Sequence, residues 1–63
     1  MDAKDMLRYL LKDGLTEEAI ASFVKVHQST ISRVLSGKIP DPKSSLTHAI
    51  KMLFEQNAHS ADP

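Results

Sequence analysis

Four polar side chains at helical spacing have the chemistry needed to recognise the edges of DNA bases. They are Gln28, Ser29, Ser32 and Arg33. A glutamine amide donates to and accepts from an adenine edge, and an arginine guanidinium donates twice to guanine, each pair giving about 1–3 kcal/mol of discrimination. A serine hydroxyl contacts any base, so the serines add little specificity alone. The alternative is that all four side chains only solvate a surface helix.

These side chains lie on a helix predicted over residues 28–36 and closed by Gly37. At about 100° per residue they project opposite three apolar side chains, Ile31, Val34 and Leu35. A helix with an apolar back and a polar front can enter the major groove, with Gln28 at the end that points inward. The pattern therefore predicts a base-reading helix.

Two further helices are predicted before it. The first covers residues 3–12, shows the i, i+3, i+4, i+7 spacing of one buried face, and is followed by Gly14 at a position that tolerates positive φ. The second begins at the N-cap Thr16, and Leu15 with Ile20 has the spacing of a hydrophobic staple. Its inward-facing residues are expected to be Ile20, Phe23 and Val24. With the helix over 28–36 it forms a helix-turn-helix.

A fourth helix is predicted to start at the pair Asp41-Pro42, with Asp41 as cap and Pro42 as its first residue. Its apolar positions are Leu46, Ala49, Ile50, Leu53 and Phe54. Residues 57–63 show no periodicity and are expected to form a disordered tail. Since no segment alternates with period two, the sequence predicts an all-α, compact four-helix domain over residues 1–56, with a central helix-turn-helix.

The formal net charge is zero, but its distribution is uneven. Residues 1–24 carry three basic and five acidic side chains, residues 25–51 carry five basic and one acidic, and residues 52–63 carry two acidic ones. The positive segment contains the predicted base-reading helix, and a local field steers ligands whatever the total charge. Neutral overall charge predicts modest non-specific affinity and few phosphate contacts.

Contacts to the DNA backbone are expected from residues that flank this helix. Lysines can pair with phosphate, and a hydroxyl or imidazole near a helix N-terminus can add hydrogen bonds. The expected residues are Thr16, Lys25, His27, Lys38 and Lys43. The alternative for each lysine is simple solvation at the surface.

The order of these features resembles the helix-turn-helix of lambdoid phage Cro and repressor proteins. The matching positions are Ala21, Val24, Val26, Ile31 and Val34. The run over residues 26–33 is close to that family's recognition helix, and residues 35–40 resemble its connection to the fourth helix. The resemblance implies a lambda-repressor-like fold and a transcriptional regulator, a repressor, with base contacts at the four positions named above.

Two positions depart from the pattern of that family. Lys25 stands where a glycine is usual, so either the lysine adopts positive φ at a cost of about 1 kcal/mol or the turn is shaped differently. Glu17 stands where many members carry a glutamine that contacts the DNA backbone, and a carboxylate would repel phosphate. That backbone contact is therefore not expected here.

The expected partner is double-stranded DNA, as a palindromic operator bound by one subunit per half-site. We expect a monomer or weak homodimer in solution that becomes a dimer on DNA. Phe54 could pair two subunits or complete the core of one, and the core is favoured. Two alternatives remain open, a DNA-binding antitoxin or co-regulator and a protein-interaction module that uses the fold without DNA.

Other chemistries find little support in the residues. Three histidines, at positions 27, 48 and 59, lack the i, i+3 or i, i+4 spacing of paired metal ligands, and no cysteine is present. No nucleophile elbow or glycine-rich phosphate loop occurs, so neither an enzyme nor a cofactor is expected. Without a signal-like start or an apolar stretch of about 20 residues, the expected location is the cytoplasm, at the nucleoid of a bacterial host.

Overall fold

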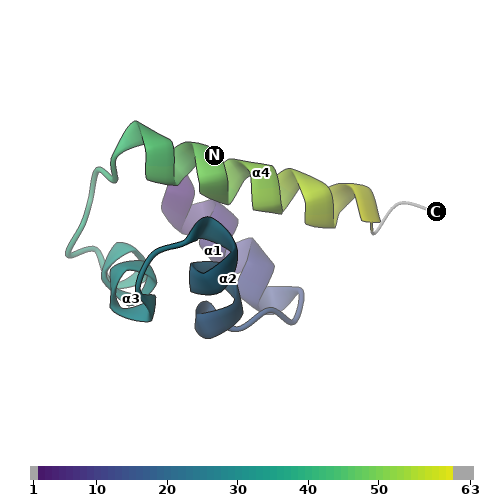
Figure 1. Cartoon of the computed structure of the whole chain (residues 1–63), viewed down its shortest axis with the longest axis horizontal. Coiled ribbons are helices and arrows are strands. Elements are labelled where there is room, and N and C mark those ends of the chain that lie inside the picture. The colour runs from purple at the N-terminus through teal and green to yellow at the C-terminus, as the bar shows by residue number, and fades with distance from the viewer. Residues whose placement is uncertain (1, 61–63) are drawn as a thin grey trace.

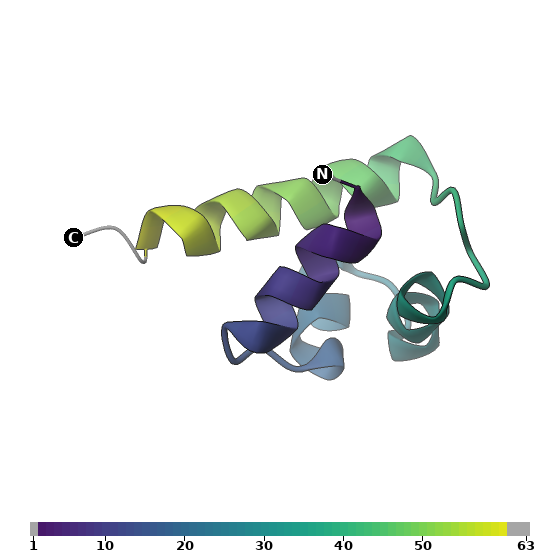
Figure 2. The same cartoon turned by 180° about the vertical axis from the view of Figure 1, so that it is seen from behind.

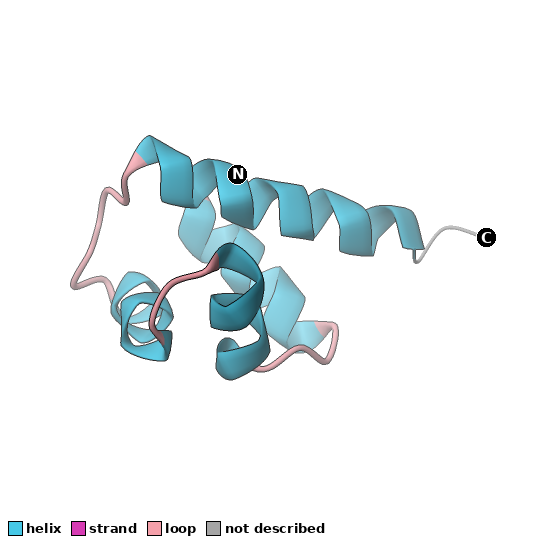
Figure 3. Ribbon diagram, in the orientation of Figure 1, coloured by secondary structure: helices cyan, strands magenta, loops and turns pink. Residues whose placement is uncertain are grey.

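The computed structural model describes residues 2–60, and the side chains of residues 2–58, as an arrangement of four helices without strands (Figures 1 and 3). The helices are α1 (Ala3–Lys12), α2 (Glu17–Val24), α3 (Gln28–Ser36) and α4 (Ser44–Ser60). The predicted all-α fold and the predicted limits of the first and third helices are confirmed. No helix within residues 2–60 has the length and apolar character needed to span a bilayer.

The long helix α4 provides the surface on which the other elements assemble. It packs against α1 and α2, while α3 packs against α2 and α1. Figures 1 and 2 show α4 running the length of the molecule, with α3 near its N-terminal end and its C-terminal end extending past the other helices. The domain measures 36 × 20 × 18 Å. In this arrangement α3 lies at one end of the molecule.

All four helices contribute to one apolar core. Its buried residues are Ala3, Met6, Leu7, Leu10, Ile20, Ala21, Ile31, Val34, Ile50 and Leu53. The i, i+3, i+4, i+7 spacing of α1 correctly predicted that helix's buried face. No polar or charged side chain among residues 2–58 is buried in this core. The packing between the described parts of the helices is therefore apolar.

Phe23 was predicted to face the core, and this prediction is wrong because 46% of its surface is exposed. α2 buries Ile20 and Ala21, with Val24 half-buried between them on the helix surface. At 100° per residue Phe23 lies about 60° beyond Ile20, on the side away from Ala21. The eight-residue helix α2 contacts its neighbours over a narrow face, so this flanking position stays in solvent.

Phe54 packs within the chain. It is half-buried against the core, and its ring lies 4.9 Å from that of Tyr9, at an interplanar angle of 74°. This edge-to-face geometry is favourable for an aromatic pair. The contact joins α1 to α4 and matches the expected core role of Phe54.

Glycines end two of the helices as predicted. Gly14 has a φ of +109° and Gly37 a φ of +88°. After α1, the Gly14 amide donates to the Leu11 carbonyl and the Leu15 amide to the Leu10 carbonyl, both at 3.1 Å. This pair of bonds is a Schellman motif, which satisfies the last carbonyls of the helix. It turns the chain sharply into α2.

The start of α4 differs from the predicted start at Asp41-Pro42. The helix begins at Ser44, and the Lys43 carbonyl accepts the first bond from the Thr47 amide at 3.0 Å. The Ile39 amide donates back to the Arg33 carbonyl at 3.2 Å, so the chain first wraps around the end of α3. Residues 38–43 therefore form a connection. The favourable cap pair Asp41-Pro42 does not start a helix, because this part of the chain packs around the end of α3.

The end of α4 also differs from the expected disordered tail over residues 57–63. The helix continues through Ser60, and the Asn57 side-chain amide donates to the Leu53 carbonyl at 3.0 Å. No glycine or proline interrupts residues 44–60, and each residue added to an existing helix gains one backbone bond. Periodicity was thus a poor guide to where the helix ends. Residues 61–63 lie outside the described residues.

Candidate nucleic-acid interface

The two sides of α3 differ completely in exposure. Ile31 and Val34 are 0% and 2% exposed, and Leu35 is half-buried against the core. The four predicted base-reading residues, Gln28, Ser29, Ser32 and Arg33, are all exposed. The core thus holds the apolar side of α3, which presents its amide, guanidinium and hydroxyl groups together to solvent.

The turn before α3 is tight and contains a strained residue. Lys25 has φ +61° and ψ +47°, the left-handed conformation that favours glycine. The Ala21 carbonyl accepts from the amides of both Lys25 and Val26, the latter at 3.0 Å. The half-buried Val26 side chain packs against the core. The lysine therefore takes the glycine-type conformation, the first of the two possibilities at this position, held by backbone bonds and by Val26.

The N-termini of α2 and α3 are capped differently. The Thr16 hydroxyl oxygen accepts from the Ala19 amide at 3.0 Å, and its hydrogen is still available to donate to an anion. His27 caps α3 only through its backbone, since its carbonyl accepts from the Thr30 amide at 2.9 Å and its side chain makes no capping bond. Glu17 and Glu18 occupy the first turn of α2. The start of α2 is therefore acidic, and that of α3 is not.

The five residues predicted to contact the DNA backbone are all exposed. Lys25 and Lys43 line one hollow together with Thr30 in the first turn of α3, although 18 positions separate them in the chain. Lys38 follows Gly37 at the opposite end of α3. Thr16 and His27 cap α2 and α3. The fold thus brings two of the predicted lysines to the N-terminal end of α3 and one to its C-terminal end.

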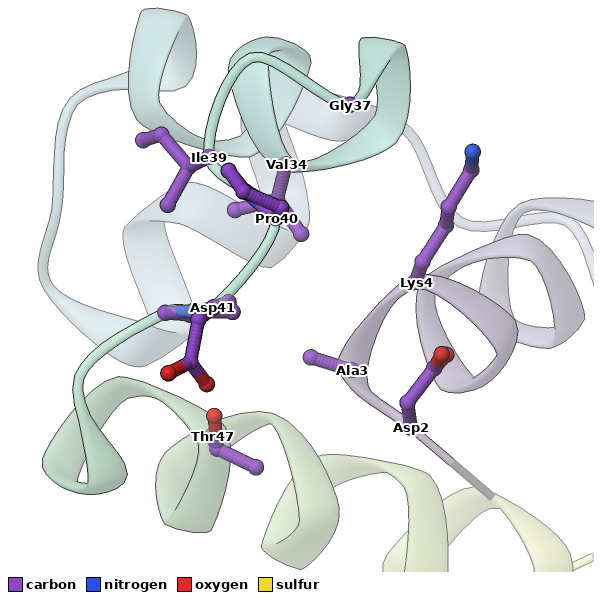
Figure 4. Close-up of a pocket in the computed structure, with 10 residues that line it drawn as sticks. Asp2, Ala3, Lys4, Val34, Gly37, Ile39, Pro40, Asp41 and Thr47 are labelled. Atoms are coloured by element: carbon purple, nitrogen blue, oxygen red, sulfur yellow. The ribbon is translucent and has the colours of Figure 1, made fainter.

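A second hollow lies at the C-terminal end of α3, between this end, the start of α1 and the connection to α4 (Figure 4). Lys4 and Gly37 both line it. Sequence reasoning did not select Lys4, because it lies in the acidic N-terminal segment, far from α3 in the chain. Packing of α1 against α3 brings it there, and no local sequence signal indicates this contact.

Within residues 2–58, no group of three or more His, Cys, Asp or Glu side chains could hold a metal ion. His27 precedes α3 and His48 lies on α4, while the side chain of His59 is outside the described residues. The exposed groups on α3 are hydrogen-bond donors and acceptors. Their chemistry fits recognition of a polar ligand.

Two short helices joined by a tight turn, the second with a free polar face, define a helix-turn-helix domain. The sequence model of the family described as "Sigma-54, DNA binding domain" matches residues 6–63. The chain belongs to this family of DNA-binding domains. The resemblance to Cro and repressor proteins agrees with it on a DNA-binding helix-turn-helix, and the finer Cro-type assignment stays a prediction.

The chain is also similar to protein P2 of Acyrthosiphon pisum secondary endosymbiont phage 1, with 36% identity over 50 residues. The alignment covers 79% of this chain and 53% of the phage protein, so the chain spans about half the length of that relative. Comparison with solved structures gave no significant match.

Proposed function

We propose that this protein is a sequence-specific regulator of transcription, a Cro-type repressor that inserts α3 into the major groove of double-stranded DNA. One observation carries the proposal, namely that Gln28, Ser29, Ser32 and Arg33 are exposed together on a helix whose other side is fixed by the core. A rigid helix positions side chains more precisely than a loop does. Gln28 would read adenine and Arg33 guanine, with the serines adding less selective contacts.

Backbone contacts would hold the domain in register on the duplex. Lys25 and Lys43 would bind phosphate beside the N-terminal end of α3, and Lys38 beside its C-terminal end. Thr16 and His27 would add hydrogen bonds from the caps of α2 and α3. The net positive charge of residues 25–51 supports this arrangement.

In this proposal the protein is not an enzyme and needs no cofactor. It would act at the bacterial nucleoid on a palindromic operator, as a dimer on DNA formed from monomers or weak homodimers. The burial of Phe54 against Tyr9 removes one apolar side chain from a potential subunit interface, which supports weak association. The similarity to a phage-encoded protein supports a phage-type regulator.

Binding-site selection from a random duplex library tests base reading. The parent should enrich one motif, while Gln28→Ala and Arg33→Ala should each lose preference at different positions of it. Gln56→Ala is a matched control, because Gln56 is equally exposed but lies on α4. If both substitutions in α3 left the enriched motif unchanged, α3 would not be the base-reading element.

A second candidate is a domain whose partner is a protein. It would be either a DNA-binding co-regulator or antitoxin, or a protein-interaction module that does not bind DNA. The exposure of Phe23 and Met52, 46% and 48%, favours it, because apolar side chains of this size contribute well to protein interfaces. Titration with duplex DNA at low salt separates a DNA-binding protein from an interaction module that works without DNA. Binding that weakens as salt rises supports DNA recognition, and failure to bind at low salt supports the interaction module.

A further inference from the structure

We propose that Lys4 of α1 contacts a DNA phosphate beside the C-terminal end of α3, so that α1 takes part in DNA binding. This inference rests on the proposed function and extends it to a helix outside the helix-turn-helix. It assigns a binding role to a residue in the acidic N-terminal segment.

The position of Lys4 is set by the packing of α1 against α3. Lys4 is half-buried and lines the hollow that Gly37 and Val34 also line. Figure 4 shows its side chain extending from α1 on the side of Gly37, with the nitrogen at the far end. Lys38, a proposed phosphate contact, directly follows Gly37 in the chain. Two lysines from different parts of the sequence therefore belong to this end of α3.

Two carboxylates line the same hollow, and neither neutralises Lys4 through an ion pair. Asp2 caps α1, with one oxygen accepting from the Asp5 amide at 2.9 Å. Figure 4 shows Asp41 near Thr47 of α4, on the other side of the hollow from the Lys4 nitrogen. Within the described residues Lys4 forms no ion pair. Its ammonium group is available to an external anion.

The stability of α1 does not explain a lysine at this position. Lys4 is the second residue of the helix, where the positive end of the helix dipole disfavours a cation. An acidic or neutral residue would suit this turn better, as Asp5 does. A charge that opposes the local helix and lacks an internal partner is better explained by an interaction with a ligand.

The length of α3 indicates what that ligand is. Nine residues at 1.5 Å each make a helix about 13.5 Å long, close to the major-groove width of about 12 Å. With its N-terminal end in the groove, a helix of this length brings its C-terminal end out near a sugar-phosphate backbone. Lys25 and Lys43 lie at the N-terminal end of α3. Lys38 and Lys4 would supply the phosphate contacts at its C-terminal end.

The test measures how the affinity for duplex DNA depends on salt, using the duplex enriched in the selection experiment above. Each phosphate contact contributes about 0.9 to the slope of log affinity against log salt concentration. We expect Lys4→Ala to reduce the steepness of the parent's slope by about 0.9, and Lys4→Arg to retain it. Lys12→Ala is the matched control, because it removes the same charge from an exposed position at the other end of α1.

The outcomes separate this inference from the proposed function. If the parent enriches no duplex, or binds without salt dependence, the proposed function fails. If the parent binds as expected but Lys4→Ala keeps its slope, or changes it no more than Lys12→Ala does, the role of Lys4 is wrong and the role of α3 stands. Circular dichroism should show unchanged helix content in Lys4→Ala, since alanine is the stronger helix former.

Discussion

The inward and outward sides of α3 differ in what they contribute. The inward side packs into the core, and the outward side presents polar side chains to solvent. Ile31 and Val34, on the inward side, are almost completely buried, whereas Gln28 and Arg33 are exposed and make no side-chain hydrogen bond within the described residues. Changes on the inward side must alter stability, while changes on the outward side can alter ligand preference at little cost to the fold. If α3 reads bases as proposed, sequence recognition can therefore vary while the scaffold stays constant.

The largest effect is expected on the inward side. Ile31→Ala removes a completely buried side chain from the centre of the core and should lower the free energy of unfolding by about 2–5 kcal/mol. Ser32→Ala, at the next position but exposed, should change it by less than about 0.5 kcal/mol. Urea denaturation followed by circular dichroism measures both. Equal effects of the two substitutions would show that the inward and outward sides of α3 do not differ in their contribution to stability.

The next largest effect is expected on the outward side, in binding and not in stability. Arg33→Ala should lose about 1–3 kcal/mol of discrimination between the enriched duplex and one with the contacted base pair changed. Its unfolding midpoint in urea should stay that of the parent, because the guanidinium is exposed. Fluorescence anisotropy with labelled duplexes gives the affinities. A loss of stability matching the loss of binding would contradict this division.

Substitutions in the turns before and after α3 are expected to have a smaller effect on stability. Lys25→Gly should stabilise the domain by about 1 kcal/mol, because glycine adopts φ +61° without strain. Gly37→Ala should destabilise it by a similar amount, through backbone strain alone, because an added Cβ at Gly37 would meet nothing within 4 Å. Thermal unfolding of both variants would reveal the opposite signs. A destabilised Lys25→Gly would mean that the lysine side chain contributes more than its strain costs.

The smallest effect is expected for Ser29→Ala. Its hydroxyl is exposed and can hydrogen-bond to any base, so both stability and discrimination should change by less than about 0.5 kcal/mol. The same urea and anisotropy measurements apply. A loss of discrimination as large as that of Arg33→Ala would place the centre of base reading nearer the start of α3 than the side-chain chemistry indicates.

Local signals were sufficient to predict most helix limits. Thr16 and Gly37 fix helix ends through bonds within a few residues, and the periodicity of α1 identifies its buried face. Such features depend on neighbours in the chain, so the sequence displays them directly. The exposure of the four residues proposed to read bases followed equally well from the 100° rotation per residue.

The features that could not be predicted depend on contacts between distant segments. Phe23 is exposed because of where α3 and α4 pack on α2, and Lys4 lies near Gly37 because α1 crosses α3. The start of α4 at Ser44 follows a connection in which the Ile39 amide bonds back to the Arg33 carbonyl. Helical periodicity carries no information about such packing, so these positions required the structure.

The contact between Tyr9 and Phe54 also gives the protein an intrinsic optical reporter. The chain contains one tyrosine and no tryptophan, so its ultraviolet fluorescence originates essentially from Tyr9. That ring lies against Phe54, where α1 meets α4, and on a different helix from the side chains proposed to read bases. Its emission can therefore follow the separation of α1 from α4 without an attached dye.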